Sequence, residues 1–119
     1  MPEDAGEDTA ALEAALLALY DYYRRTARMW TVSHRDVDLV PALQGPMQAF
    51  LDYLAAYAGA LLARPSGTEA SAGARAAAML AVQFTTWRTL DMASLPDRAM
   101  ARLMANCIRV AEAMPRGAR

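Results

Sequence analysis

The sequence has no lysine, one cysteine and one histidine. Its 12 basic residues are therefore all arginines, and 13 acidic residues leave a formal charge of -1. A chain without excess positive charge has no field with which to hold a phosphate backbone, so we do not expect this segment alone to bind DNA. The lone Cys107 excludes a disulfide within the chain and is typical of a reducing compartment, so the expected location is the cytoplasm.

Long apolar runs are missing as well. The hydrophobic share is high, at 55%, but the longest run, from Tyr53 to Ala63, is far shorter than the roughly 20 residues that cross a bilayer. The first residues, MPEDAGED, carry acids where a secretory signal carries lysine or arginine. We expect no membrane span, a disordered leader over residues 1–8, a single helical domain over residues 9–114 and a disordered tail over residues 115–119.

Apolar residues recur at helical spacing in four stretches, and the alternation typical of strands is absent. The stretches cover residues 8–33, 46–63, 74–92 and 95–114, with Ser94 in a position to cap the last one. Pro41, Gly45 and Pro46 interrupt the pattern between the first two. The expected fold class is all-α, a four-to-five-helix bundle.

The last two predicted helices carry more apolar surface than one small bundle easily covers. Over residues 74–92, Leu80, Phe84 and Trp87 share one face, while a second apolar face remains. Either this helix is the central helix of a monomer, or a second copy of the chain covers the surplus in a four-helix seam. The residues expected at such a dimer interface are Met79, Thr86, Leu90, Met100, Leu103, Met104, Cys107, Ile108 and Ala111.

Little in the sequence points to catalysis or to a metal. His34, Asp36 and Asp38 alternate, and alternate residues on a helix point to different faces, so they bind a metal only if the segment is extended. The other interpretation is a solvated helix end. Cys107 lies in an apolar arc without a basic neighbour, which favours core or interface over a nucleophile. We expect no enzyme, no cofactor and no metal, with a tyrosine hydroxyl acting beside His34 or Asp21 as the open alternative.

Aromatic residues are concentrated in the first three predicted helices. Tyr22 and Tyr23 are adjacent, so they face directions about 100° apart, and at least one can point into a cavity or an edge. Together with Tyr53 and Tyr57 they would supply several rings with polar tips, as a small-molecule pocket between helices requires. The alternative is that these rings are ordinary core.

Four segments carry a resemblance to a known family. They are ALYDYYRRT (residues 18–26, followed by Met29), DLVPAL (38–43), FLDYL (50–54) and FTTWRTL (84–90). Together they resemble the C-terminal regulatory domain of the tetracycline-repressor (TetR/AcrR) family of bacterial transcriptional regulators. The similarity extends from about Leu12 to Ala113 and is to the wording of one subgroup rather than to a family-wide signature.

The resemblance implies a homodimer whose last two helices form an intersubunit four-helix bundle, and a cavity between the earlier helices and one face of the third. The wall residues that it implies are Tyr23, Trp30, Phe50, Tyr53, Tyr57, Phe84 and Trp87. The implied function is that of an effector-sensing and dimerisation domain of a repressor, binding a small apolar molecule. DNA would be contacted only through a helix-turn-helix domain absent from this chain. The alternative is a freestanding helical carrier or scavenger of an apolar small molecule, with no DNA role.

Overall fold

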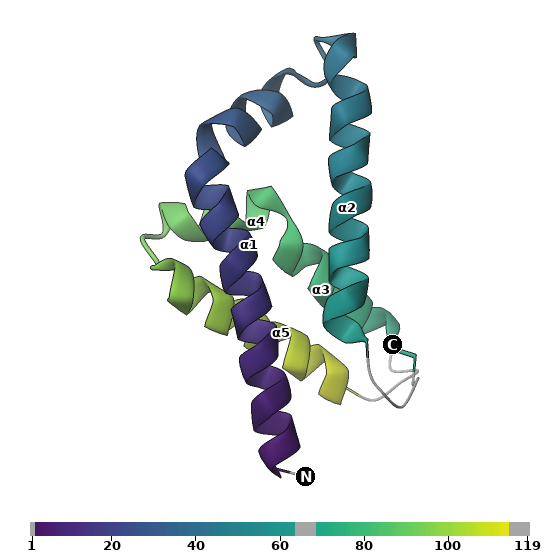
Figure 1. The fold of residues 1–119 in the computed structure, drawn as a ribbon, viewed down its shortest axis with the longest axis vertical. Helices are drawn as coiled ribbons and strands as arrows, with labels where there is room; N and C mark the ends of the chain where they lie inside the picture. The colour runs from purple at the N-terminus through teal and green to yellow at the C-terminus, as the bar shows by residue number, and fades with distance from the viewer. Residues whose placement is uncertain (1, 64–68, 115–119) are drawn as a thin grey trace.

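The computed structural model of the chain describes residues 2–63 and 69–114, with side chains from residue 9 onward. No strand occurs among these residues, so the expected all-α class is confirmed. Figure 1 shows the elements in chain order. They are α1 (Pro2–Asp36), the short 3-10 helix η1 (Pro41–Leu43), α2 (Gln44–Leu62), α3 (Ala72–Val82), α4 (Phe84–Met92) and α5 (Asp97–Ala113).

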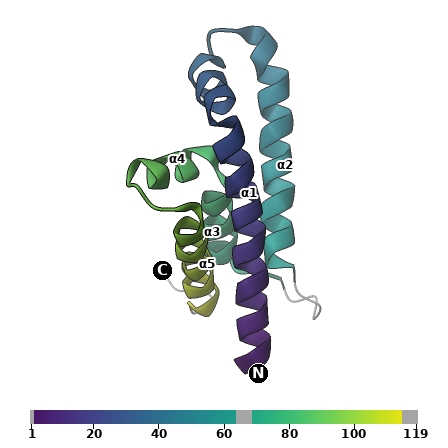
Figure 2. The ribbon, with the colours of Figure 1, turned by 60° about the vertical axis from the view of Figure 1, so that its left-hand side comes forward.

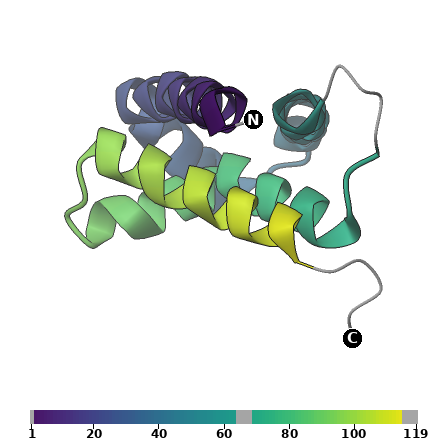
Figure 3. The same ribbon diagram turned by 90° about the horizontal axis from the view of Figure 1, so that it is seen from below.

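The helices lie in two layers. Figure 3 shows α1 and α2 in one layer and α3, α4 and α5 in the other. Between the layers, α1 packs mainly on α5 and α2 packs on α3, while α3 and α5 lie against each other within their own layer. Figure 2 shows α1 and α2 running alongside each other. Because residues 37–43 connect them, these two helices are tethered at one end.

The long helix α1 bends at Thr26, whose backbone is non-helical (φ -120°, ψ 15°). The Thr26 hydroxyl donates a hydrogen bond to the carbonyl of Tyr22 at 2.7 Å. Such a bond from a threonine to the preceding turn bends helices. Past the bend, the Trp30 ring stacks on Phe50 of α2, with the ring centroids 3.9 Å apart. The bend therefore brings the end of α1 onto α2.

The ends of the helices differ in places from the expected ones. Helix α1 begins at Pro2 rather than near Asp8, so its backbone is helical over most of the segment expected as a disordered leader. Residues 115–119, expected as a disordered tail, lie outside the described residues. Ser94, the expected cap of the last helix, instead has a left-handed φ of 66°. It lies in the turn before α5, whose N-cap residue is Pro96.

The single helix expected over residues 74–92 is broken at Gln83, which is extended (φ -70°, ψ 140°). No proline or glycine lies between residues 74 and 92, so local sequence does not explain the break. Two tyrosines of α1 donate hydrogen bonds to the carbonyls just before the break. The Tyr20 hydroxyl donates to the carbonyl of Ala81 and the Tyr23 hydroxyl to that of Val82, each at 2.6 Å. Tertiary contacts thus hold the break.

One continuous core joins all five helices. Leu16 on α1, Leu54 on α2 and Ile108 on α5 are each 0% exposed. Helix α3 contributes mainly small side chains such as Ala74 and Ala78, and small side chains let packed helices approach closely. In the part of the chain that the structure describes, no helix is both long and apolar enough to cross a membrane.

The buried position of Leu16 gives a direct test of this core. Leu16→Ala should lower the free energy of unfolding by about 2–5 kcal/mol, because it removes a fully buried side chain and leaves a cavity. Leu39 is 78% exposed, so Leu39→Ala is a matched control and should change stability by less than about 0.5 kcal/mol. Urea unfolding followed by circular dichroism measures both. Equal losses for the two variants would contradict the packing.

Candidate functional site

A cleft of about 480 Å³ lies between α1 and α2. A volume of this size is in the range of small-molecule sites. Residues on one face of each helix line it, at spacings of three and four residues. They are Ala18, Leu19 and Tyr22 on α1 and Phe50, Tyr53 and Tyr57 on α2.

The lining of this cleft is aromatic and carries no formal charge. Of its three hydroxyls, that of Tyr57 already donates to the carbonyl of Ala15 at 2.6 Å. The hydroxyls of Tyr22 and Tyr53 have no hydrogen-bond partner among the described residues. The cleft therefore offers apolar walls with two available hydroxyl groups. This is suited to an uncharged molecule with rings and a polar substituent, because an ionised group would lose hydration there without a partner.

An aromatic core lies behind Phe50 rather than in the cleft. Tyr23 is its centre: its ring centroid lies 5.3 Å from that of Phe84, 6.2 Å from that of Phe50 and 6.3 Å from that of Trp87. Tyr23, Phe84 and Trp87 are at most 3% exposed. They are therefore packed against one another in the core, and none of them lines the cleft.

The seven residues implied as cavity wall thus divide into two groups. Phe50, Tyr53 and Tyr57 line the cleft, whereas Tyr23, Phe84 and Trp87 are core and Trp30 covers the far side of Phe50. On the α1 side, the sequence indicated Tyr22, one of two adjacent tyrosines that can face a cavity, but not Ala18 or Leu19. The spacing of Ala18 and Tyr22, one helical turn apart, was the available signal.

Comparisons of the chain with protein-family models, with curated proteins and with solved structures each found no match. The function of the chain is therefore inferred from its own residues.

An ionic contact ties α1 to the end of α4 and the start of α5. The Arg24 guanidinium donates to both carboxylate oxygens of Asp97 at 3.0 and 2.9 Å and to Asp91 at 2.6 Å. It also lies 5.2 Å from the centroid of the Trp87 ring, whose Nε1 donates to Asp97 at 3.3 Å. These hydrogen bonds, first to Asp97 and then to Asp91, raise the pKa of Arg24. The contact thus links α1 to α4 and to α5.

His34 and Asp36, considered in the sequence as metal ligands, lie at the end of α1. His34 Nδ1 lies 2.8 Å from the carbonyl of Trp30, and because a carbonyl only accepts, the ring proton lies on Nδ1. Asp36 accepts hydrogen bonds from Arg35 at 2.8 and 3.1 Å, which lower the pKa of Asp36. Among the described residues no group of three or more histidine, cysteine or acidic side chains is arranged for a metal.

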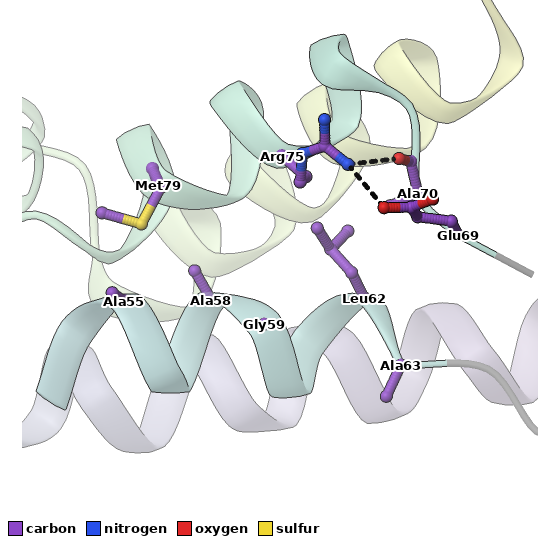
Figure 4. Close-up of a pocket in the computed structure, with 9 residues that line it drawn as sticks. All are labelled: Ala55, Ala58, Gly59, Leu62, Ala63, Glu69, Ala70, Arg75 and Met79. Carbon is purple, nitrogen blue, oxygen red and sulfur yellow. Dashed lines mark hydrogen bonds and ion pairs between the residues drawn. The ribbon is translucent and has the colours of Figure 1, made fainter. Parts of the chain in front are cut away.

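A second cavity, of about 390 Å³, lies between α2 and α3. Figure 4 shows its α2 side made mostly of small residues, with Arg75 and Met79 reaching in from α3. Arg75 donates to the carbonyl of Ala70 at 2.9 Å and pairs with Glu69 at 3.7 Å. Its guanidinium is thus already engaged with the segment before α3. Met79, expected at the dimer interface, faces this cavity instead.

The outer surface of α5 carries an apolar stripe. Leu103, Cys107, Val110 and Met114 are exposed and follow one another at intervals of four, three and four residues, so they share one side of the helix. The stripe adjoins Ala111, whose carbonyl oxygen would lie 4.0 Å from a Cβ at position 73 of α3.

Helix α3 continues this surface with Gly73, Ala76 and Leu80, all exposed and at helical spacing. We call the two stripes together the α3–α5 face. It consists of Gly73, Ala76, Leu80, Leu103, Cys107, Val110 and Met114.

The residues expected at a dimer interface are distributed differently. Leu103 and Cys107 belong to the α3–α5 face, and Ala111 is half-buried beside it. Met100, Met104 and Ile108 are at most 5% exposed within the chain's own core, so they offer no surface to a partner. Thr86 and Leu90 are half-buried on α4.

Leu80 was expected on one face with Phe84 and Trp87. Those three positions share a face only on a continuous helix. The break at Gln83 turns α4 so that Phe84 is buried while Leu80 is 58% exposed.

The buried tyrosines predict a loss of stability at alkaline pH. Burial, and secondarily Cys107, raises the pKa of Tyr20, and burial, followed by Tyr20, raises that of Tyr23. An unfolded tyrosine ionises near pH 10. Their contribution to stability is therefore fully present below about pH 10 and is lost as the pH rises from there toward the raised pKa values, at about 1.4 kcal/mol per pH unit for each.

Urea unfolding at pH 8 and at a series of values above pH 10 measures this loss. Because the chain has no lysine, that range is free of lysine titration. Tyr23→Phe should reduce the slope of stability against pH by about 1.4 kcal/mol per pH unit, since one of the two groups is removed. A slope that is the same in the wild type and in Tyr23→Phe would refute this assignment.

Proposed function

We propose that this chain is the effector-sensing and dimerisation domain of a TetR-like transcriptional regulator, and that a small uncharged molecule binds in the cleft between α1 and α2. The observation that carries the proposal is the cleft itself. It has aromatic walls, no charged lining residue and two hydroxyls, those of Tyr22 and Tyr53, without a hydrogen-bond partner in the described part of the chain. Closely packed helices leave little empty space between their side chains. An open apolar cleft that also presents a few hydroxyl groups is typical of a binding site.

The chemistry of the lining specifies the class of effector. Faces of Tyr22, Phe50 and Tyr53 favour flat rings, which stack on aromatic side chains. The two hydroxyls each donate and accept, so a hydroxyl, carbonyl or amine on the ligand finds a partner. The expected effector is a neutral ring compound with one or two polar substituents.

The neutral fluorescent dye N-phenyl-1-naphthylamine is a suitable probe of the cleft. Its emission should increase on binding the wild-type chain, and Ala18→Trp should weaken binding by at least about tenfold, because the indole fills the cleft. Ala14→Trp is the control: Ala14 is exposed one turn earlier on α1 and does not line the cleft. Equal binding by both variants would place the dye elsewhere and reject the cleft as the site.

The second part of the proposal concerns self-association. The exposed apolar residues of α5 follow one another at intervals of four, three and four residues, which is the spacing found where two helices pack together. Helices α1 and α3 cover the opposite side of α5, so they are not the helices that pack on this stripe. The α3–α5 face carries no charged side chain, so it has no charge pattern that would select an oppositely charged partner. A second copy of the chain presents the same apolar stripe, as a two-fold symmetric interface requires. We therefore assign this face to a homodimer with α3 and α5 from each copy.

Sedimentation over a concentration series tests the dimer. The wild type should be dimeric well above micromolar concentrations, and the double variant Leu103→Glu/Val110→Glu should be monomeric, because it buries four charges in a symmetric seam. Leu39→Glu/Met92→Glu is the control: it adds the same charge at residues 78% and 76% exposed outside the face. A bismaleimide should link Cys107 to its copy in the wild type and in this control, but not in Leu103→Glu/Val110→Glu.

These two tests also separate the regulator from the carrier. A wild-type chain that is monomeric at every concentration but binds the dye in the cleft would favour a freestanding carrier of apolar molecules. In the regulator, binding in the cleft biases one of two dimer arrangements, and DNA is read by a helix-turn-helix domain outside these residues.

A further inference from the structure

The break between α3 and α4 consists of one residue. Helix α3 ends at Val82, Gln83 is extended, and α4 begins at Phe84. Glutamine is a good helix former, the side chain of Gln83 makes no capping hydrogen bond, and no proline or glycine lies nearby. The β-branched Val82, Thr85 and Thr86 lower the local helix propensity only slightly, so the sequence contains no helix breaker and tertiary contacts set the position of the break.

The break leaves specific hydrogen bonds unmade. In an unbroken helix, the carbonyl of Ala81 accepts from the amide of Thr85, and that of Val82 accepts from the amide of Thr86. Neither bond is present in the structure. The two amides have no acceptor among the described residues, and no side chain caps the start of α4.

Two tyrosine hydroxyls take the places of those amides. Tyr20 donates to the carbonyl of Ala81 and Tyr23 to the carbonyl of Val82, both at 2.6 Å. The two tyrosines lie three residues apart on α1, hence on one face, and each is 0% exposed. Their hydroxyls have no access to water, so they depend on these carbonyls.

Straightening the helix would exchange one set of bonds for the other. The amides of Thr85 and Thr86 would gain the carbonyls, and two buried hydroxyls would lose them, which is costly for a buried donor. We propose that the α3–α4 junction is a two-state hinge, broken in this structure and continuous from Ala72 to Met92 in the other state, and that the hydroxyls of Tyr20 and Tyr23 hold it in the broken state.

The residues beside the hinge lie next to both the cleft and the α3–α5 face. In the broken state Phe84 packs on Tyr23, and Tyr23 packs on Phe50 of the cleft wall. In the continuous state Leu80 and Phe84 would share a face, which moves either Phe84 out of the aromatic core or Leu80 out of the α3–α5 face. The hinge itself does not require that the cleft bind a molecule.

Nuclear magnetic resonance of the full chain tests the hinge. In the wild type the backbone shifts of Gln83 should be those of an extended residue. In Tyr20→Phe/Tyr23→Phe they should move toward helical values, and amide exchange of Thr85 and Thr86 should slow by about tenfold or more as these amides gain acceptors. Each single variant should show a smaller shift in the same direction, which keeps the test open if the double variant does not fold.

Two further variants control the experiment. Tyr57→Phe removes a hydroxyl that donates to Ala15 within α1, and it should leave Gln83 extended. Gln83→Asp added to the double variant should restore the break, because aspartate caps the first amides of a helix. If Gln83 stays extended and the Thr85 and Thr86 exchange is unchanged in the single and double phenylalanine variants, packing alone sets the break and the hinge is refuted.

Discussion

The arrangement of this protein depends on two hydrogen bonds between α1 and the end of α3. The hydroxyls of Tyr20 and Tyr23 are buried and bond to backbone carbonyls that a straight helix would use itself. A buried hydroxyl needs a partner, and a broken helix needs donors for its last carbonyls. Helix α1 thus supplies the donors that the end of α3 needs, and α3 supplies the acceptors that the buried tyrosines need. These hydrogen bonds set the direction in which α4 leaves α3.

The two layers divide the surfaces between them. The layer of α1 and α2 holds the aromatic cleft, and the outer side of α3 and α5 holds the α3–α5 face. Tyr23 lies between the two, since its ring contacts Phe50 behind the cleft and its hydroxyl holds Val82 at the end of α3. Packed side chains therefore connect the two surfaces over a short distance.

Much of the secondary structure could be predicted from the sequence, because apolar periodicity and proline positions are local signals. The break at Gln83 could not, since no proline or glycine lies near it and the hydroxyls that bond the carbonyls before it belong to residues 61 and 59 positions earlier in the chain. Because periodicity does not reveal this break, it wrongly places Leu80 on the same face as Phe84. The cleft was predicted in part: Phe50, Tyr53 and Tyr57 line it, but whether a ring faces a cavity or the core depends on how the helices pack, which periodicity does not give. Met100 and Ile108 were expected at a dimer interface for a similar reason. A helical wheel gives the width of an apolar arc but not which neighbouring element covers it.

The cleft is bounded at both ends along the axis of α1. At one end the rings of Trp30 and Phe50 are stacked, and at the other the Tyr57 hydroxyl is bonded to Ala15. The stretch of helix from Ala15 to Tyr22 rises about 10 Å, roughly the span of two or three fused rings. If a molecule binds there as proposed, these two contacts would limit its length along α1: a compact polycyclic compound would fit between them, whereas an extended chain would project into water.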